Sequence, residues 1–123
     1  MCLDKAKAPT KTWGFGYKWV TKVDDGHYES WDCMSKEGTP YAPIGEWGTD
    51  ANNRSITDHH GNSYPAGYHI MTGTPRHYKY WCNDVVTVHV RYRKAVAQET
   101  TPDPVYGNVV VAKEMKILRE VLS

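Results

Sequence analysis

The segment Asp84–Ala97 alternates between two kinds of side chain more regularly than any other part of the sequence. One set of alternate positions is apolar, and the other is polar or charged. The two sets are Val86, Val88, Val90 and Tyr92 on one side, and Thr87, His89, Arg91 and Arg93 on the other. Because successive side chains of a strand point to opposite faces, this pattern predicts a strand with one buried face. The chain is therefore expected to fold around an antiparallel sheet.

A second strand is predicted at Trp13–Val23, where large apolar residues again alternate with small or polar ones. Four aromatic residues share one face of this strand: Trp13, Phe15, Tyr17 and Trp19. Asp24-Asp25-Gly26 is a turn signal of the kind that closes hairpins, so His27–Asp32 is expected to return beside the first strand. The first unit of the fold is therefore predicted to be a β-hairpin.

The C-terminal segment fits two patterns. Four apolar residues lie at helical spacing, namely Val111, Met115, Leu118 and Leu122. Alternate positions between Val109 and Ile117 also suit a strand. We expect a strand through about Lys116, followed by either a frayed end or one helical turn.

A length of 123 residues with 40% hydrophobic side chains suits one domain with one core, spanning 1–123. The predicted fold class is α+β but mostly β. We expect a twisted antiparallel sheet of about five to seven strands that closes toward a barrel, with little helix. Residues 1–12 are expected to form an N-terminal arm or entry strand. Residues 49–63 are rich in turn formers and are expected to form a long exposed loop, which in a compact domain is usually functional or mobile.

Charge and cysteine content narrow the function classes. A formal net charge of +1 disfavours a duplex-DNA binder, which would rely on neutralising phosphates. No apolar run approaches the roughly 20 residues of a membrane span, and the N-terminus has no basic-then-apolar export signal. The three cysteines, Cys2, Cys33 and Cys82, have no short metal spacing, so free thiols in a reducing cytoplasm are expected.

Histidines raise the question of a metal site. Asp58-His59-His60 is the densest group, but adjacent histidines on an extended chain point to opposite sides, so no metal site is predicted. His69 lies in Gly67-Tyr68-His69, next to a glycine that would let a ligand approach the backbone. It is either a buried, hydrogen-bonded histidine or a ligand-binding imidazole.

Two further residues have alternative interpretations. Cys2 would become an N-terminal nucleophile if the initiator methionine is removed, with its own amine as the base and His69 nearby. The other interpretation is a small apolar residue at the start of a strand. Gly73–Arg76 is a turn without the lysine of a phosphate loop. Arg76, Arg91 and Arg93 could still bind an anion through bidentate contacts.

The sequence resembles a group of small, mostly uncharacterised domains of bacteriophages and their bacterial hosts. The resemblance covers most of the chain through short motifs: Met1-Cys2-Leu3, Gly16–Lys18, Tyr41 with Ile44–Trp47, Gly67-Tyr68-His69, Val85–Arg93 and Val110–Ile117. In that group the histidine motif usually reads Gly-Phe-His. The resemblance implies a phage-type accessory protein in the cytoplasm of a host cell, possessing activity against a host defence.

The arrangement is also distantly similar to ADP-ribosyltransferase-type folds. That similarity implies a catalytic role for Glu114, NAD as a substrate, and Tyr17 with Tyr68 or His69 as further site residues. The sequence departs from the pattern at Lys18, where an arginine or histidine would hold NAD, and it lacks a Ser-Thr-Ser motif.

The leading prediction is a binding protein rather than an enzyme, without a cofactor or a metal. It would hold a host protein or a small nucleotide-like ligand, with rings stacking on a base and cations meeting phosphate or carboxylate. The predicted ligand-binding residues are Trp13, Tyr17, Lys18, Tyr68, His69, Arg76 and Arg91. The alternative is a small enzyme, either of the ADP-ribosyltransferase kind with NAD as substrate or with Cys2 as an N-terminal nucleophile. Across these alternatives the candidate catalytic residues are Cys2, His69 and Glu114. Sheet edges and exposed aromatic rings would permit homo-oligomers.

Overall fold

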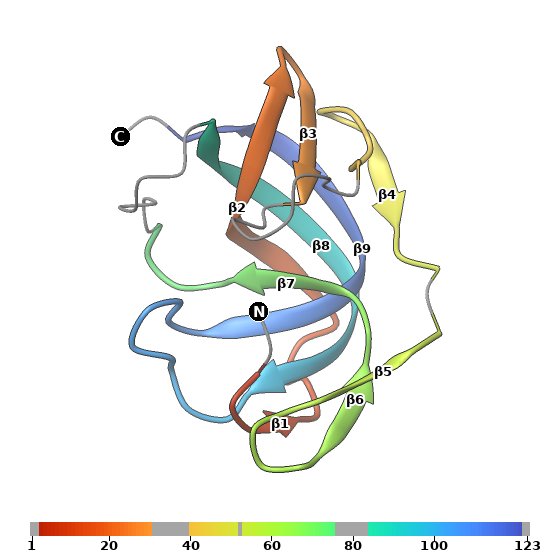
Figure 1. The fold of residues 1–123 in the computed structure, drawn as a ribbon, viewed down its shortest axis with the longest axis vertical. Helices are drawn as coiled ribbons and strands as arrows, with labels where there is room; N and C mark the ends of the chain where they lie inside the picture. Colours follow the sequence, from red (N-terminus) through yellow and green to blue (C-terminus); the bar gives the residue numbers. More distant parts are fainter. Residues whose placement is uncertain (1–2, 31–39, 52, 76–83, 122–123) are drawn as a thin grey trace.

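All regular elements of the described chain are strands (Figure 1). The structure is a computed structural model that describes residues 3–30, 40–51, 53–75 and 84–121. The strands are β1 Ala6–Lys7, β2 Trp13–Asp24, β3 His27–Ser30, β4 Trp47–Thr49, β5 Ser55–Thr57, β6 Ser63–Pro65, β7 Tyr68–Met71, β8 Val85–Glu99 and β9 Val109–Glu120. This confirms the predicted mostly β fold, and these residues include no helix.

Seven strands form one antiparallel sheet, which closes on itself. Along the sheet the order is β1-β8-β2-β7-β9-β4, with β3 added beside β2, and β8 also pairs with β9. The strands β8, β2, β7 and β9 therefore form a ring, as the predicted closure toward a barrel requires. The three long strands curve strongly around this ring in Figure 1. Between β2 and β7 the ring is closed by the pairing of Tyr17 with Met71.

The interior of the ring is lined by the apolar positions of the alternating strands. Most of the prediction for β8 is confirmed, because Val88, Val90 and Tyr92 are buried while Arg91 and Arg93 are exposed. Thr87 is the exception, since it belongs to the polar set and is buried as well. The main core consists of buried side chains from five strands: Val20, Tyr28, Ile70, Val88, Val90, Tyr92, Val110, Ala112, Met115 and Ile117. These valines and isoleucines are branched at Cβ, which suits a pleated, half-buried surface.

One glycine allows the ring to close tightly. A Cβ at Gly16 would lie 2.5 Å from Ile70 Cγ2 and 2.5 Å from the carbonyl oxygen of Met71. No side chain fits at that distance, so β2 and β7 can approach each other only because Gly16 lacks one.

A second core cluster joins the N-terminal segment to the small β5–β6 sheet. Leu3 and Val111 are fully buried in this cluster, together with Tyr64, Ala97 and Val109. Figure 1 shows β5 and β6 at the opposite end of the molecule from the β2–β3 hairpin.

Side-chain acceptors hold the N-terminal segment in place. Glu99 accepts hydrogen bonds from the backbone N–H groups of Asp4 and Lys5, both at 2.8 Å. Asp58 accepts one from the N–H of Ala6 at 2.7 Å.

The stretch 49–63 was expected to be a long exposed loop, and the structure differs from this expectation at two places. Strand β5 lies at its centre, and the Asp58 side chain is buried.

The remaining predictions concern the hairpin and the last strand. The turn at Gly26 joins β2 to β3 with a positive φ of 83°, as the hairpin signal predicts. β9 extends to Glu120 rather than ending near Lys116, and no helical turn follows within the described residues. The extension results from pairing with β8, where Val88 lies opposite Glu120. Within the described ranges no helix is long and apolar enough to cross a membrane.

Candidate functional site

Strand register arranges the outward-facing side chains of β2, β8, β9 and β4 in rows across the sheet. Residues paired directly across neighbouring strands share a face, so each row consists of side chains in contact range. The three rows are Tyr17-His89-Arg119, Phe15-Arg91-Lys116-Trp47 and Trp13-Arg93-Glu114-Thr49. We call the surface formed by the aromatic, histidine and cationic side chains of these rows the aromatic–cationic face.

Arginines on this face lie over aromatic rings. The guanidinium of Arg91 lies 5.7 Å from the ring centre of Trp13, 5.8 Å from that of Phe15 and 5.9 Å from that of Trp47. Arg93 lies 3.9 Å from the centre of the Trp47 ring, and the Lys116 ammonium lies 5.0 Å from it. These distances are within the range of cation–π attraction, about 6 Å from the ring centre.

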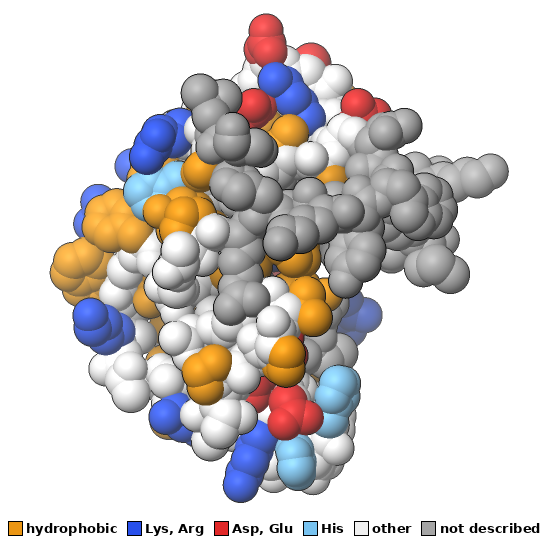
Figure 2. Space-filling model, turned by 90° about the vertical axis from the view of Figure 1, so that its left-hand side faces the viewer, with side chains coloured by type: hydrophobic (Ala, Val, Ile, Leu, Met, Phe, Trp, Pro, Cys, Tyr) orange, Lys and Arg blue, Asp and Glu red, His pale blue; other side chains and the backbone are white. Residues whose placement is uncertain are grey.

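Aromatic rings continue the face along β2. Trp13 and Phe15 meet edge to face at 6.5 Å, and His89 is stacked between Phe15 at 5.8 Å and Tyr17 at 5.0 Å. Trp13 is 56% exposed and Phe15 is 51% exposed, although both are large apolar rings. Figure 2 shows hydrophobic side chains gathered at one edge of the molecule, with histidine and Lys or Arg side chains beside them. Exposed rings of this size next to unsatisfied cations are more typical of binding surfaces than of solvated sheet faces.

Positive charge on the face is only partly neutralised. Glu114 is 7% exposed and is bound by Arg93, by Lys94 at 3.3 Å and by Thr49 at 3.4 Å. The hydrogen bond from Arg93, followed by that from Lys94, lowers the pKa of Glu114. In the part of the chain that is described, Arg91 and Lys116 have no carboxylate partner. The face therefore combines exposed rings with free cations.

His69 belongs to a buried hydrogen-bond network instead of this face. Its side chain is 8% exposed; Nδ1 lies 3.2 Å from the Gly67 carbonyl oxygen and Nε2 lies 3.0 Å from the Tyr64 hydroxyl. The Gly67 carbonyl oxygen can only accept, so Nδ1–H donates to it, and Nε2 of the neutral imidazole accepts from the Tyr64 hydroxyl. The Tyr64 oxygen in turn accepts the N–H of Leu3 at 3.0 Å. Burial lowers the pKa of His69 to about 4, which keeps the imidazole neutral near pH 7.

Lys18 points into the ring, and Tyr68 is engaged with another aromatic residue. The Lys18 ammonium donates a hydrogen bond to the His69 carbonyl oxygen at 2.7 Å, and burial lowers its pKa to about 8. Tyr68 packs against Tyr41 with ring centres 5.8 Å apart, and burial raises its pKa. Among the predicted site residues, the structure brings together Trp13, Tyr17 and Arg91, and separates them from Lys18, Tyr68 and His69. Arg76 and Cys2 lie outside the described residues.

Several members of the face were not predicted as site residues. Phe15, His89 and Arg93 belong to the predicted strand faces, with Arg93 also a possible anion-binding residue, and Trp47 belongs to one of the short motifs that carry the resemblance. The alternation of β2 and β8 already placed the first three on the faces where they occur. What it does not give is the pairing of β4 with β9, because Trp47 is separated from Lys116 by most of the chain.

The residues implied by a transferase fold are engaged elsewhere. Glu114, the candidate catalytic carboxylate, is bound by two cations, and His69 is bound within its own network. Within the described ranges no group of three or more His, Cys, Asp or Glu side chains could hold a metal ion. Comparisons with protein-family models, curated proteins and solved structures found no match for this chain.

Proposed function

We propose that the aromatic–cationic face binds nucleotide bases and phosphates, as a short single strand or as a small nucleotide-like ligand. The observation that supports the proposal most is the position of Arg91 over Trp13 and Phe15, two rings that remain about half exposed. Base–aromatic stacking contributes about 1–3 kcal/mol per base, and arginine adds a cation–π contribution. Arg91, Lys116 and Arg119 have no carboxylate partner among the described residues and are suited to phosphate groups along the same face.

This geometry suits single bases better than a duplex. Bases of a duplex are already stacked on one another, whereas an unpaired base can lie on an exposed ring. A protein partner is the other candidate ligand of such a face, and the test below separates the two. The setting in a phage or its host, and in the cytoplasm, remains a proposal based on sequence resemblance and cysteine content.

The proposal is tested by fluorescence anisotropy with a labelled oligothymidylate of about eight nucleotides. We expect binding that weakens as salt increases. Trp13→Ala and Phe15→Ala should each weaken binding by at least about tenfold, which corresponds to the stacking energy of one base. Arg91→Ala should weaken binding and reduce the dependence of log Kd on log salt by about one.

Matched controls lie outside the face. Val105→Ala truncates another exposed apolar side chain, and Lys7→Ala removes an exposed cation from β1. Both should leave the affinity within about twofold of the unaltered protein, as expected for surface substitutions. If neither the oligonucleotide nor free nucleoside monophosphates bind, the nucleotide proposal is wrong, and a protein ligand becomes the better interpretation of the face.

A further inference from the structure

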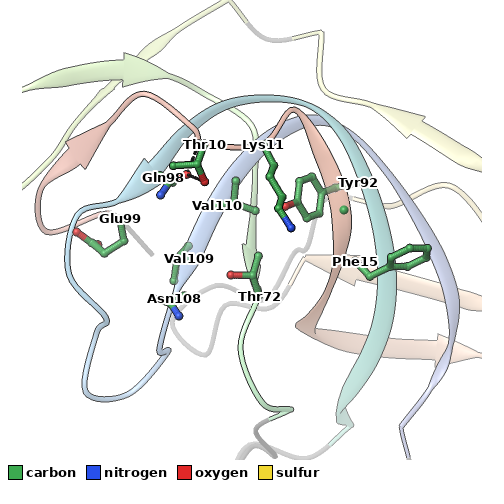
Figure 3. A pocket seen from close by; sticks show the side chains of 11 residues that line it. Thr10, Lys11, Phe15, Thr72, Tyr92, Gln98, Glu99, Asn108, Val109 and Val110 are labelled. Carbon is green, nitrogen blue, oxygen red and sulfur yellow. Dashed lines mark hydrogen bonds between the residues drawn. The ribbon is translucent and has the colours of Figure 1, made fainter.

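A pocket of about 410 Å³ lies between the beginning of β2, the end of β8 and the beginning of β9 (Figure 3). This volume lies within the range of small-molecule sites, and such sites often occupy the mouths of β-barrels. Most of the lining side chains are polar, and the aliphatic residues of the lining are Val109 and Val110. Figure 3 shows the Phe15 ring directed away from the pocket, so Phe15 lines it without pointing into it.

The Tyr92 hydroxyl in this pocket is a buried donor without a partner. Tyr92 is 5% exposed, yet within the described residues its hydroxyl makes no hydrogen bond. The hydroxyl lies over Gly14, where it would be 2.7 Å from a Cβ if that residue had one. A buried hydroxyl is usually hydrogen-bonded, and leaving one unpaired costs free energy. The hydroxyl is therefore available to a molecule that enters the pocket.

Two other polar groups of the lining are already engaged. The side-chain oxygen of Gln98 accepts hydrogen bonds from the backbone N–H and the hydroxyl of Thr10, at 2.6 Å and 3.1 Å. The Glu99 carboxylate accepts the backbone N–H groups of Asp4 and Lys5. The negative charge of Glu99 is thus directed at the N-terminal segment rather than at the pocket.

The free polar groups that remain can all donate a hydrogen bond, the hydroxyls and the amide can also accept one, and one group is charged. The Lys11 ammonium makes no ion pair within the described part of the chain. In Figure 3 its side chain extends toward the ring of Tyr92. Thr72 and Asn108 add a hydroxyl and an amide without a side-chain hydrogen bond in the same part of the chain. A ligand that matches this set carries one negative charge, several hydroxyl groups and a small apolar surface.

The geometry points to a second binding site in this pocket, for a small polyhydroxylated anion of the size of a sugar phosphate or a sugar acid. Lys11 binds the phosphate or carboxylate. The Tyr92 hydroxyl, Thr72 and Asn108 bind the sugar hydroxyls, and Val109 and Val110 contact the apolar face of the ring. This site is independent of the aromatic–cationic face and does not rest on the function proposed for it.

The test uses ribose 5-phosphate and glucuronate as probes, with inorganic phosphate and glucose as the partial ligands. Amide chemical shifts are followed by NMR, and Kd is obtained by titration calorimetry. We expect shifts at Thr72, Asn108 and Val109, with tighter binding of the two complete probes than of either partial ligand. Tighter binding of ribose 5-phosphate would identify a phosphate site, and tighter binding of glucuronate would identify a carboxylate site. If neither complete probe shifts these amides, the inference is wrong.

Two variants distinguish the site from a merely structural role. Lys11→Met should weaken binding of the preferred probe roughly ten- to hundredfold, and Lys7→Met on β1 should not change it. Tyr92→Phe should weaken binding about three- to tenfold without lowering Tm, because the hydroxyl it removes has no partner in the free protein. Trp13→Ala should bind the probe normally. If Lys11→Met and Tyr92→Phe bind like the unaltered protein, or if Tyr92→Phe lowers Tm, the pocket is not the site we infer.

Discussion

His69 makes the stability of this protein depend on pH in a way that can be calculated. Burial lowers the pKa of His69 from its ordinary value of 6.5 to about 4 in the folded chain. In the unfolded chain the imidazole recovers its ordinary pKa, so between pH 6.5 and pH 4 the unfolded state binds a proton that the folded state does not. Stability is therefore unaffected above about pH 6.5 and falls as the pH is lowered toward 4.

The magnitude follows from the difference between the two pKa values. That difference is about 2.5, and each unit corresponds to about 1.36 kcal/mol, so the full loss is roughly 3 kcal/mol. At pH 5 the loss is about 2 kcal/mol, which is a large share of the 5–15 kcal/mol that typically separates folded from unfolded domains.

The measurement is urea unfolding of the unaltered protein and of His69→Gln at several pH values between 7.5 and 4.5. Glutamine keeps an acceptor near Tyr64 but does not titrate in this range. The difference between the two proteins isolates the histidine, because other titrating groups contribute equally to both. The difference in the free energy of unfolding between the unaltered protein and His69→Gln should narrow by about 2 kcal/mol between pH 7 and pH 5. His59→Gln, at an exposed position of the turn after β5, should follow the unaltered protein.

A constant difference across this range would refute the reasoning. It would mean that the imidazole accepts a proton in the folded state, so that the network of Tyr64 and Gly67 does not hold it neutral. An NMR titration of the His69 ring provides the independent check, with a midpoint expected well below pH 6.

Three further substitutions test the packing and the N-terminal segment. Gly16→Ala should cost about 1–3 kcal/mol in urea unfolding, because the new methyl group would overlap Ile70, whereas Gly73→Ala, in open space, should be nearly neutral. Leu3→Ala should cost about 2–5 kcal/mol, since Leu3 is fully buried, and a loss below 1 kcal/mol would show that the N-terminal segment adds little to the core. Burial acts to raise the pKa of Asp58, but three backbone N–H groups lower it to about 2, so Asp58 stabilises the fold above about pH 4 and less as the pH falls toward 2. Asp58→Asn should reduce the urea midpoint at pH 7 and should lose less stability than the unaltered protein as the pH falls from about 4 toward 2. An equal loss of stability in both proteins would contradict this role of Asp58.

Local pattern was enough to predict the two long strands β2 and β8 and the face that each residue occupies. The alternation of β8 identified Val88 and Val90 as core residues, and the aromatic alternation of β2 placed Trp13 and Phe15 together. Both are period-two signals carried within a single strand. Sequence alone therefore located the two strands that form half of the aromatic–cationic face.

Pairing between distant strands could not be predicted in the same way. Nothing local to Trp47 indicates that it lies beside Lys116, and nothing local to His69 indicates that Tyr64 donates to its ring. The end of β9 illustrates the same limit. Helical and strand spacing were both compatible with its sequence, and the choice was made by the neighbouring strand β8.

Closure of the ring also determines how copies of this protein could meet. In the large sheet of the described chain, the strands left with a free edge are β1, β3 and β4, which have two, four and three residues. Such short edges offer few unpaired backbone groups to a second sheet, which is a common protection against aggregation. Association through the edges of this sheet is therefore disfavoured, and the exposed rings of β2 offer a copy of the chain an apolar side-chain surface instead. A ligand on that face would then compete directly with self-association, so oligomer size should depend on ligand concentration.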